Sequence, residues 1–179
     1  MSKIICIDPA HGGKDPGAVN GAKHEAIAAL AIARKVGAVL ESKGYEVVYT
    51  RTKDKYLTLA ERCTISNSKN ADAFISIHLN AAENKDAEGI ETWRYQTVGA
   101  TTKALASNIQ EELITATGAK PRGVKTTTTL YVLRRTKAPA VLIECGFISN
   151  NYEAKQLFAD SYQSKLAKAI VKGVEKTIK

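Results

Sequence analysis

Ala73–Leu79 reads AFISIHL, a short and almost uninterrupted apolar run that predicts a buried strand. Two further runs of this kind occur at Lys3–Ile7 (KIICI) and Ala140–Cys145 (AVLIEC). Strands as apolar as these are typical of parallel sheets, because helices cover both faces of such sheets. The three runs therefore favour a sheet with helices on either side.

The segments between these runs alternate between helical and extended patterns. Glu25–Lys43 repeats apolar residues at intervals of three and four and is followed by Gly44, which is typical of a helix and its end. By the same reasoning we expect further helices at Leu57–Asn70, Thr101–Thr117, Asn151–Phe158 and Tyr162–Ile178, and further strands at Glu46–Thr50, Gly89–Tyr95 and Leu130–Arg134. This alternation predicts an α/β fold: a single three-layer domain over residues 1–179, in which helices flank a central, mostly parallel, twisted sheet of about six strands.

Composition limits the class of protein. The 179 residues include 26 Lys and Arg against 18 Asp and Glu, a net charge of +8, and the 44% of hydrophobic residues excludes a disordered chain. No apolar run approaches the ~18 residues of a membrane span, and we expect no signal peptide. The positive charge favours an anionic partner. Because aromatic residues are only 6% and no basic block is present, we expect no nucleic acid as that partner.

Three of the predicted strands lead into residues with distinctive chemistry. The loop Asp8–Ala18 (DPAHGGKDPGA) contains His11, His78 lies near the end of its strand, and Glu144 lies within AVLIEC. In open α/β sheets the functional groups gather at the carboxyl ends of the strands, so we expect these three side chains at one edge of the sheet. A carboxylate among apolar residues is also costly to bury unless it is paired or functional.

Two imidazoles and a carboxylate are a common ligand set for a catalytic zinc ion, whose fourth position is left to water. His11 and His78 are the candidate imidazoles. His24 and Glu25 compete as the third ligand at the start of a helix, where adjacent side chains point about 100° apart, so that only one can face the site. The residues alone do not decide between them.

Several familiar catalytic motifs are missing from the sequence. The patterns H-E-x-x-H, G-x-x-x-x-G-K-[ST] and G-x-S-x-G do not occur, which argues against a thermolysin-type zinc helix, a P-loop and an α/β-hydrolase serine. The three cysteines are odd in number and widely spaced, so we expect them to be buried thiols, with a Cys145 nucleophile as a minor alternative. A zinc peptidase or deacetylase on the same α/β plan remains open at this point, as does a non-catalytic basic module that binds wall polymer.

A series of motifs runs through the whole chain. It comprises DPAHGGKDPGA (8–18), YTRTKD (49–54), LTLAER (57–62), FISIHLNA (74–81), GIETW (89–93), RGVK (122–125) and LYVLRRTKAPAVLIECGFISN (130–150). With these motifs the chain resembles the zinc-dependent N-acetylmuramoyl-L-alanine amidases (amidase-3 type) of bacterial autolysins and phage endolysins. Ala10 departs from the glycine that is usual there, but this removes no functional group.

The resemblance implies a peptidoglycan hydrolase that cleaves the amide bond between N-acetylmuramic acid and the L-alanine of the stem peptide. It matches His11, Glu25 and His78 to the ligands of one zinc ion, and it thereby favours Glu25 over His24. It matches Glu144 to the catalytic glutamate.

Further expectations concern the substrate and the setting of the reaction. Asn80 and Arg122 are expected to contact the substrate, whereas Thr126–Thr129 is expected to be a solvated loop before a strand. We expect a monomer that acts on the bacterial cell wall, whose anionic polymers would attract the positive chain.

Overall fold

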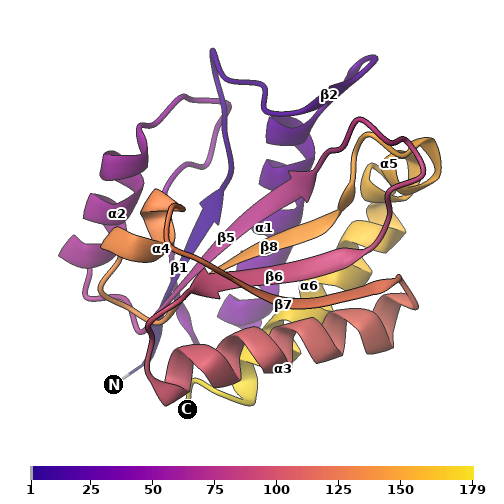
Figure 1. Ribbon diagram of the computed structural model, residues 1–179. Coiled ribbons are helices and arrows are strands. Elements are labelled where there is room, and N and C mark those ends of the chain that lie inside the picture. The colour runs from indigo at the N-terminus through magenta and orange to yellow at the C-terminus, as the bar shows by residue number, and fades with distance from the viewer. Residues whose placement is uncertain (1) are drawn as a thin grey trace.

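Six strands form the central sheet of the computed structural model, which describes residues 2–179 (Figure 1). Their order is β4-β1-β5-β8-β6-β7, with bounds Glu46–Tyr49, Ile4–Pro9, Ala73–Asn80, Ala140–Phe147, Ile90–Tyr95 and Pro121–Thr127. The first four of these strands are parallel, whereas β6 is antiparallel to β8 and parallel to β7. The predicted, mostly parallel sheet is confirmed.

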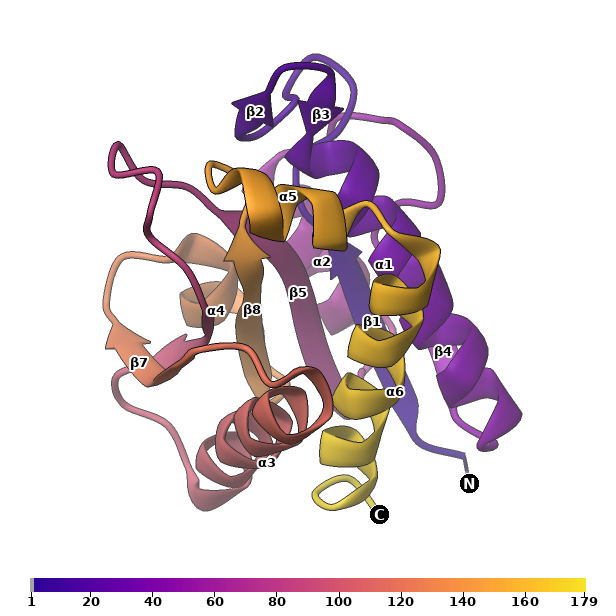
Figure 2. The same cartoon turned by 90° about the vertical axis from the view of Figure 1, so that its right-hand side faces the viewer.

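Over residues 2–179, six helices flank this sheet. They are α1 (Glu25–Ser42), α2 (Leu59–Ser68), α3 (Ala100–Thr117), α4 (Tyr131–Arg135), α5 (Asn151–Leu157) and α6 (Asp160–Glu175), and a short hairpin of β2 (Val19–Asn20) and β3 (Lys23–His24) precedes α1. Helices α1, α3 and α6 cover one face of the sheet, and α2 and α4 lie on the other (Figures 1 and 2). The five predicted helices are all present, and none of the described helices is long and apolar enough to cross a membrane.

Alternation along the strands divides their side chains between the two faces. Ile75 and Ile143 belong to the large core under α1, α3 and α6, whereas Phe74 and Leu142 belong to a smaller cluster under α2 and α4. Continuing the same alternation, the even-numbered residues near the carboxyl ends of β5 and β8 lie on the α2 and α4 side. This side of the sheet is only partly covered, and it leaves room for a site.

The strand predicted at Leu130–Arg134 is wrong, because the structure has helix α4 there. The segment contains β-branched and aromatic residues, which are enriched in strands. However, Val132 and Leu133 are both buried in the same apolar cluster. Two consecutive side chains can pack on one surface in a helical turn but not in a regular strand, where they point to opposite sides. Tertiary packing thus overrides the local preference for a strand.

The central sheet also contains a strand that was not predicted from the sequence, and the short hairpin of β2 and β3 was not predicted either. β7 reads PRGVKTT, with a proline, a glycine and only one large apolar residue. It is the edge strand next to β6, and proline is tolerated at the start of an edge strand because one side of the strand needs no ladder hydrogen bonds. The expected loop at Thr126–Thr129 is therefore wrong in part, since Thr126 and Thr127 belong to β7 and the run leads into a helix.

Both ends of the described chain lie at the amino-terminal edge of the parallel strands (Figure 1). The hydroxyl of Tyr45, just before β4, donates to the main-chain oxygen of Ile178 at 2.8 Å. Lys43 forms an ion pair with Glu175 nearby. The loops with distinctive chemistry lie at the opposite edge.

Candidate metal centre

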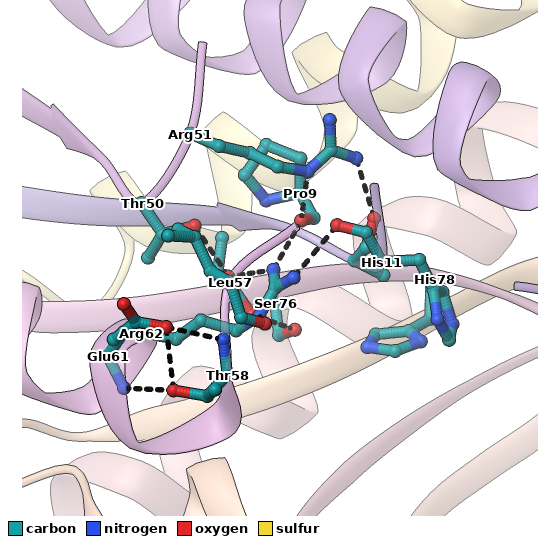
Figure 3. Close-up of polar contacts among 12 residues, drawn as sticks. Pro9, His11, Thr50, Arg51, Leu57, Thr58, Glu61, Arg62, Ser76 and His78 are labelled. Atoms are coloured by element: carbon teal, nitrogen blue, oxygen red, sulfur yellow. Dashed lines mark hydrogen bonds and ion pairs between the residues drawn. The ribbon is translucent and has the colours of Figure 1, made fainter. Parts of the chain in front are cut away.

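His11 lies in the loop that follows β1, and its backbone has a φ of 57°, in the left-handed region that non-glycine residues seldom adopt. Two arginines hold this loop by its carbonyl oxygens (Figure 3). Arg51 donates to the oxygens of Pro9 and Ala10, at 3.0 and 2.6 Å. Arg62 donates to the oxygens of Pro9 and His11, at 2.7 and 2.8 Å. These bonds stabilise the unusual backbone and fix the direction of the imidazole.

Arg62 is itself held by Asp8, the first residue of the DPAHGG motif. Arg62 Nη1 lies 2.8 Å from Asp8 Oδ1, and both side chains are almost completely buried. The hydroxyls of Thr50 and Ser76 also donate to this carboxylate, at 2.6 and 2.7 Å. Asp8 is therefore fully engaged in positioning the loop.

Glu25 is the first residue of α1, and its carboxylate lies between the two candidate imidazoles. Its Oε2 is 3.2 Å from His11 Nε2, and its Oε1 is 3.0 Å from His78 Nδ1. The backbone N–H groups of Ala18 and Leu79 donate to the same two oxygens, at 2.9 and 3.0 Å. The carboxylate is thus held in one orientation.

The structure brings together His11, Glu25 and His78, with one ligand atom from each within 4.8 Å of the others. We call this set the HEH cluster. Among the described residues 2–179, it is the one group of three or more His, Cys, Asp or Glu side chains that could hold a metal ion in this way. His24, the competing candidate, precedes α1 and does not belong to the HEH cluster.

Asp15 supports the HEH cluster from outside. Its Oδ2 lies 2.8 Å from His11 Nδ1, and its Oδ1 accepts a hydrogen bond from the backbone N–H of Gly17. Metal-binding histidines commonly donate their second N–H to a carboxylate, which fixes the ring and its tautomer. Asp15 was not among the residues predicted from the sequence, although a carboxylate four residues after His11 in the same loop was the available signal.

Protonation of the HEH cluster is strongly coupled. Burial disfavours the charged form of His11, but the carboxylates of Glu25 and Asp15 outweigh it and raise the pKa of His11 to about 9. Burial likewise disfavours ionised Glu25, yet the two imidazoles hold the pKa of its carboxyl well below the ordinary value. The metal-free cluster therefore keeps a proton at neutral pH that a bound cation would displace.

Glu144 lies on β8 directly opposite His78 in the parallel register. Its Oε2 is buried and has no hydrogen-bond partner within residues 2–179. Burial, reinforced by the carboxylates of Glu25 and Glu91, raises the pKa of Glu144 to about 7. A carboxyl group with this pKa, next to a candidate metal cluster, is suited to accept and return a proton near neutral pH.

A second buried carboxylate, Glu91 of the GIETW motif, lies opposite Glu144 in the antiparallel register of β6 and β8. Asn80 Nδ2 and Trp93 Nε1 donate to its Oε1, at 3.1 and 3.0 Å, and Arg122 Nε donates to its Oε2 at 2.8 Å. The structure therefore gathers the two predicted substrate contacts around Glu91. Glu91 was not among the residues predicted from the sequence, although a carboxylate within a predicted strand was the same signal that identified Glu144.

A cavity of about 320 Å³ opens beside His11 and His78. It lies between the segment that leads into α2 and the start of α4, and its walls include Tyr56, Leu57 and Tyr131. Space for a substrate is thus available next to the HEH cluster.

Cys145, the minor alternative nucleophile, is fully buried in the core on the other face of the sheet. Burial raises the pKa of its thiol far above the ordinary value. A neutral, inaccessible thiol cannot attack a substrate, so this alternative is wrong.

Comparisons with known proteins agree with this geometry. The profile of the N-acetylmuramoyl-L-alanine amidase family matches residues 5–176. The N-acetylmuramoyl-L-alanine amidase LytC of Bacillus subtilis (strain 168) is 38% identical over 175 residues, which cover 97% of this chain and 35% of LytC. The endolysin of Bacillus phage SPP1 is 39% identical over 183 residues, which cover 97% of this chain and 65% of the endolysin. This chain thus spans about a third of LytC and just under two thirds of the endolysin.

A solved structure extends the comparison to three dimensions. The crystal structure of N-acetylmuramoyl-L-alanine amidase from Clostridium difficile 630 has a TM-score of 0.94 and 36% identity, and the match covers 98% of this chain and 96% of that one. The likeness inferred from the motifs is confirmed by sequence and by fold. This chain belongs to the N-acetylmuramoyl-L-alanine amidase family.

Proposed function

We propose that this chain is a zinc-dependent peptidoglycan hydrolase that cleaves the amide bond between N-acetylmuramic acid and the L-alanine of the stem peptide. Membership of the amidase family supports the reaction and the substrate. The observation that carries the metal dependence is the convergence of His11, Glu25 and His78 at hydrogen-bonding distances.

The donor atoms of the HEH cluster fit zinc. Two imidazole nitrogens and one carboxylate oxygen leave one position open, as in catalytic zinc sites. Glu144 is not a further ligand in this proposal, because a fourth protein ligand would close the site. When bound, zinc supplies Lewis-acid polarisation of the scissile carbonyl and a water molecule of lowered pKa.

Glu144 carries out the proton transfers. Its Oε2 has no partner within the described chain, so it is free to accept a proton from the attacking water. The same oxygen then returns the proton to the nitrogen of the leaving L-alanine. The products are the lactyl carboxyl group of the muramic acid and a free amine on the peptide.

Asn80 and Arg122 hold the substrate in this proposal. Both side chains converge on Glu91, which neighbours Glu144 across the strand pair. Both side chains therefore lie within reach of a substrate that is bound over Glu144.

The reaction takes place on the bacterial cell wall, as the work of an autolysin or of a phage endolysin. Residues 1–179 act as a single catalytic domain and as a monomer in this proposal. The net charge of +8 attracts anionic wall polymers, an attraction that added salt weakens.

Purified peptidoglycan tests the proposal. The protein is assayed before and after chelation, with mass spectrometry of the new ends. New N-terminal L-alanine that disappears with the chelator and returns with zinc supports the proposal. Cleavage of a peptide bond would indicate a zinc peptidase, and release of acetate would indicate a deacetylase. No cleavage by the zinc-loaded protein would favour a binding module.

A further inference from the structure

Glu91 is a buried carboxylate that neither binds the metal nor transfers a proton in the proposed hydrolysis. Only 4% of the residue is exposed, and both oxygens of its carboxylate accept hydrogen bonds: Oε1 from Asn80 and Trp93, and Oε2 from Arg122. These donors come from β5, β6 and β7. A buried carboxylate that collects donors from three strands orients them with respect to one another.

Arg122 is held by this carboxylate through only one of its nitrogens. Its Nε donates to Glu91, and the guanidinium carbon lies 4.9 Å from the centre of the Phe147 ring. Its Nη1 makes one long contact, 3.5 Å, to the oxygen of Glu88, and Nη2 has no hydrogen-bond partner among residues 2–179. The side chain is 36% exposed, so the outer edge of the guanidinium is open to a ligand.

The open edge lies close to the catalytic groups. Phe147 ends β8 three residues after Glu144, and it pairs with Asn80 at the end of β5. The guanidinium over Phe147 is therefore at the same sheet edge as His78 and Glu144, on the β6 and β7 side of them.

We propose, on the basis of the hydrolysis proposed above, that Arg122 binds a carboxylate of the stem peptide and that Glu91 is the residue that positions it. The planar guanidinium matches a carboxylate, and a carboxylate gains more than a neutral amide from such donors. In a muramoyl peptide the lactyl carboxyl group is consumed by the scissile amide, so that the remaining carboxylates belong to the peptide. Arg122 thus directs the peptide half of the substrate toward β6 and β7.

Glu91 cannot be replaced by its amide without consequence. Its three donors need acceptors, and a glutamine offers one oxygen and an N–H₂ group that would face a donor. The Glu91→Gln variant therefore releases Arg122 from its fixed position while it leaves the HEH cluster and Glu144 in place.

Soluble, uncross-linked peptidoglycan strands in two forms test the inference, one with free peptide carboxylates and one with these groups converted into carboxamides. We expect the wild-type protein to cleave the carboxylate form with a kcat/KM about ten- to a hundredfold higher than that for the carboxamide form, because charge-assisted hydrogen bonds contribute about this much binding energy. Arg122→Gln should raise KM for the carboxylate form by a similar factor, leave kcat within about twofold and abolish the preference.

Two further variants separate positioning from folding. Glu91→Gln should also raise KM for the carboxylate form and keep its zinc, whereas Arg122→Lys should retain part of the preference because it keeps the charge. Glu112→Gln is the matched control, because Glu112 is a buried glutamate held by Lys172 and Lys176 away from the site. It should leave KM and the preference unchanged.

The outcomes distinguish this inference from the function on which it rests. Equal cleavage of both forms by the wild type, or an equal fall of kcat on both forms in Arg122→Gln, overturns the role of Arg122 and leaves the amidase activity standing. An unchanged KM in Glu91→Gln overturns the positioning role of Glu91. Failure of the zinc-loaded wild type on soluble strands and on intact peptidoglycan removes the proposed function and this inference with it.

Discussion

The side chain of Arg62 donates a hydrogen bond of 2.8 Å to the main-chain oxygen of His11. A residue of α2 thus fixes the backbone of a candidate metal ligand that follows β1. The same guanidinium forms a buried ion pair with Asp8. This pair therefore links helix α2 to the end of β1, from which the loop with His11 begins.

Arg62→Ala should destabilise the protein by about 3–5 kcal/mol, because it leaves the carboxylate of Asp8 buried and uncompensated. Urea unfolding of the metal-free protein measures this loss. The double variant with Asp8→Asn should recover part of it, since the unpaired charge is then gone. Arg134→Ala, at an exposed position on α4, serves as the control. Equal stability of Arg62→Ala and Arg134→Ala would contradict this role of the ion pair.

Glu144→Gln should retain one zinc ion per chain and lose activity by about 10²–10⁴-fold, because the amide cannot accept the proton of the attacking water. Metal analysis and peptidoglycan turnover measure the two properties separately. Glu46→Gln, at an exposed position on β4, should behave like the wild type. Turnover at the wild-type rate in Glu144→Gln would exclude the proton-transfer role.

His78→Ala and His24→Ala form a matched pair for the choice of ligands. His78→Ala removes a member of the HEH cluster and should abolish both stoichiometric zinc binding and turnover. His24→Ala should keep the metal, because His24 lies outside the HEH cluster. Metal content after dialysis decides the matter, and loss of zinc in His24→Ala would contradict the assignment of Glu25.

The stability of the metal-free protein should depend on the protonation of His11. Its pKa rises from 6.5 to about 9 on folding, so the stabilisation is complete below pH 6.5 and is lost as the pH rises through about 9. Zinc affinity should increase over the same interval, since fewer protons must be displaced. Unfolding curves of the metal-free protein between pH 6 and pH 10 measure the first effect. A curve independent of pH would show that His11 is not held by its carboxylates.

Gly17→Ala should weaken zinc binding. A Cβ at this position would lie 2.6 Å from both Glu25 Oε2 and His11 Cδ2, and the φ of +66° adds backbone strain. Glu25 and His11 must therefore shift away from the added Cβ, which disturbs two of the three candidate ligands. Gly21→Ala has a similar φ of +59° and open space around it, so it isolates the backbone cost. Equal zinc affinity in the two variants would show that the contact with the cluster has no effect.

The central strands could be predicted because burial on both faces leaves an apolar run that few other structures produce. His11, His78 and Glu144 could be placed at one edge of the sheet because functional groups in open α/β sheets gather at the carboxyl ends of the strands. The choice between His24 and Glu25 depends on the rotational setting of α1, which tertiary packing determines, and the residues alone left it open.

Features that depend on neighbouring elements could not be predicted. β7 pairs with only one strand and therefore needs few apolar residues, and the segment that forms α4 is helical because Val132 and Leu133 pack on the sheet together. Arg62 and Glu91 each act through partners far away in the sequence, so their roles appear only once the strands are placed side by side.

The position of the chain ends has a practical consequence for attaching this protein to other objects. Both ends of the described chain lie at the amino-terminal edge of the parallel strands (Figure 1), whereas His11 follows the carboxyl end of β1 and His78 lies near the carboxyl end of β5. A fluorescent label, a second protein or a solid support joined at either end is therefore directed away from the cluster. A polymeric substrate, which must approach as a long strand or a surface, would still meet an unobstructed face.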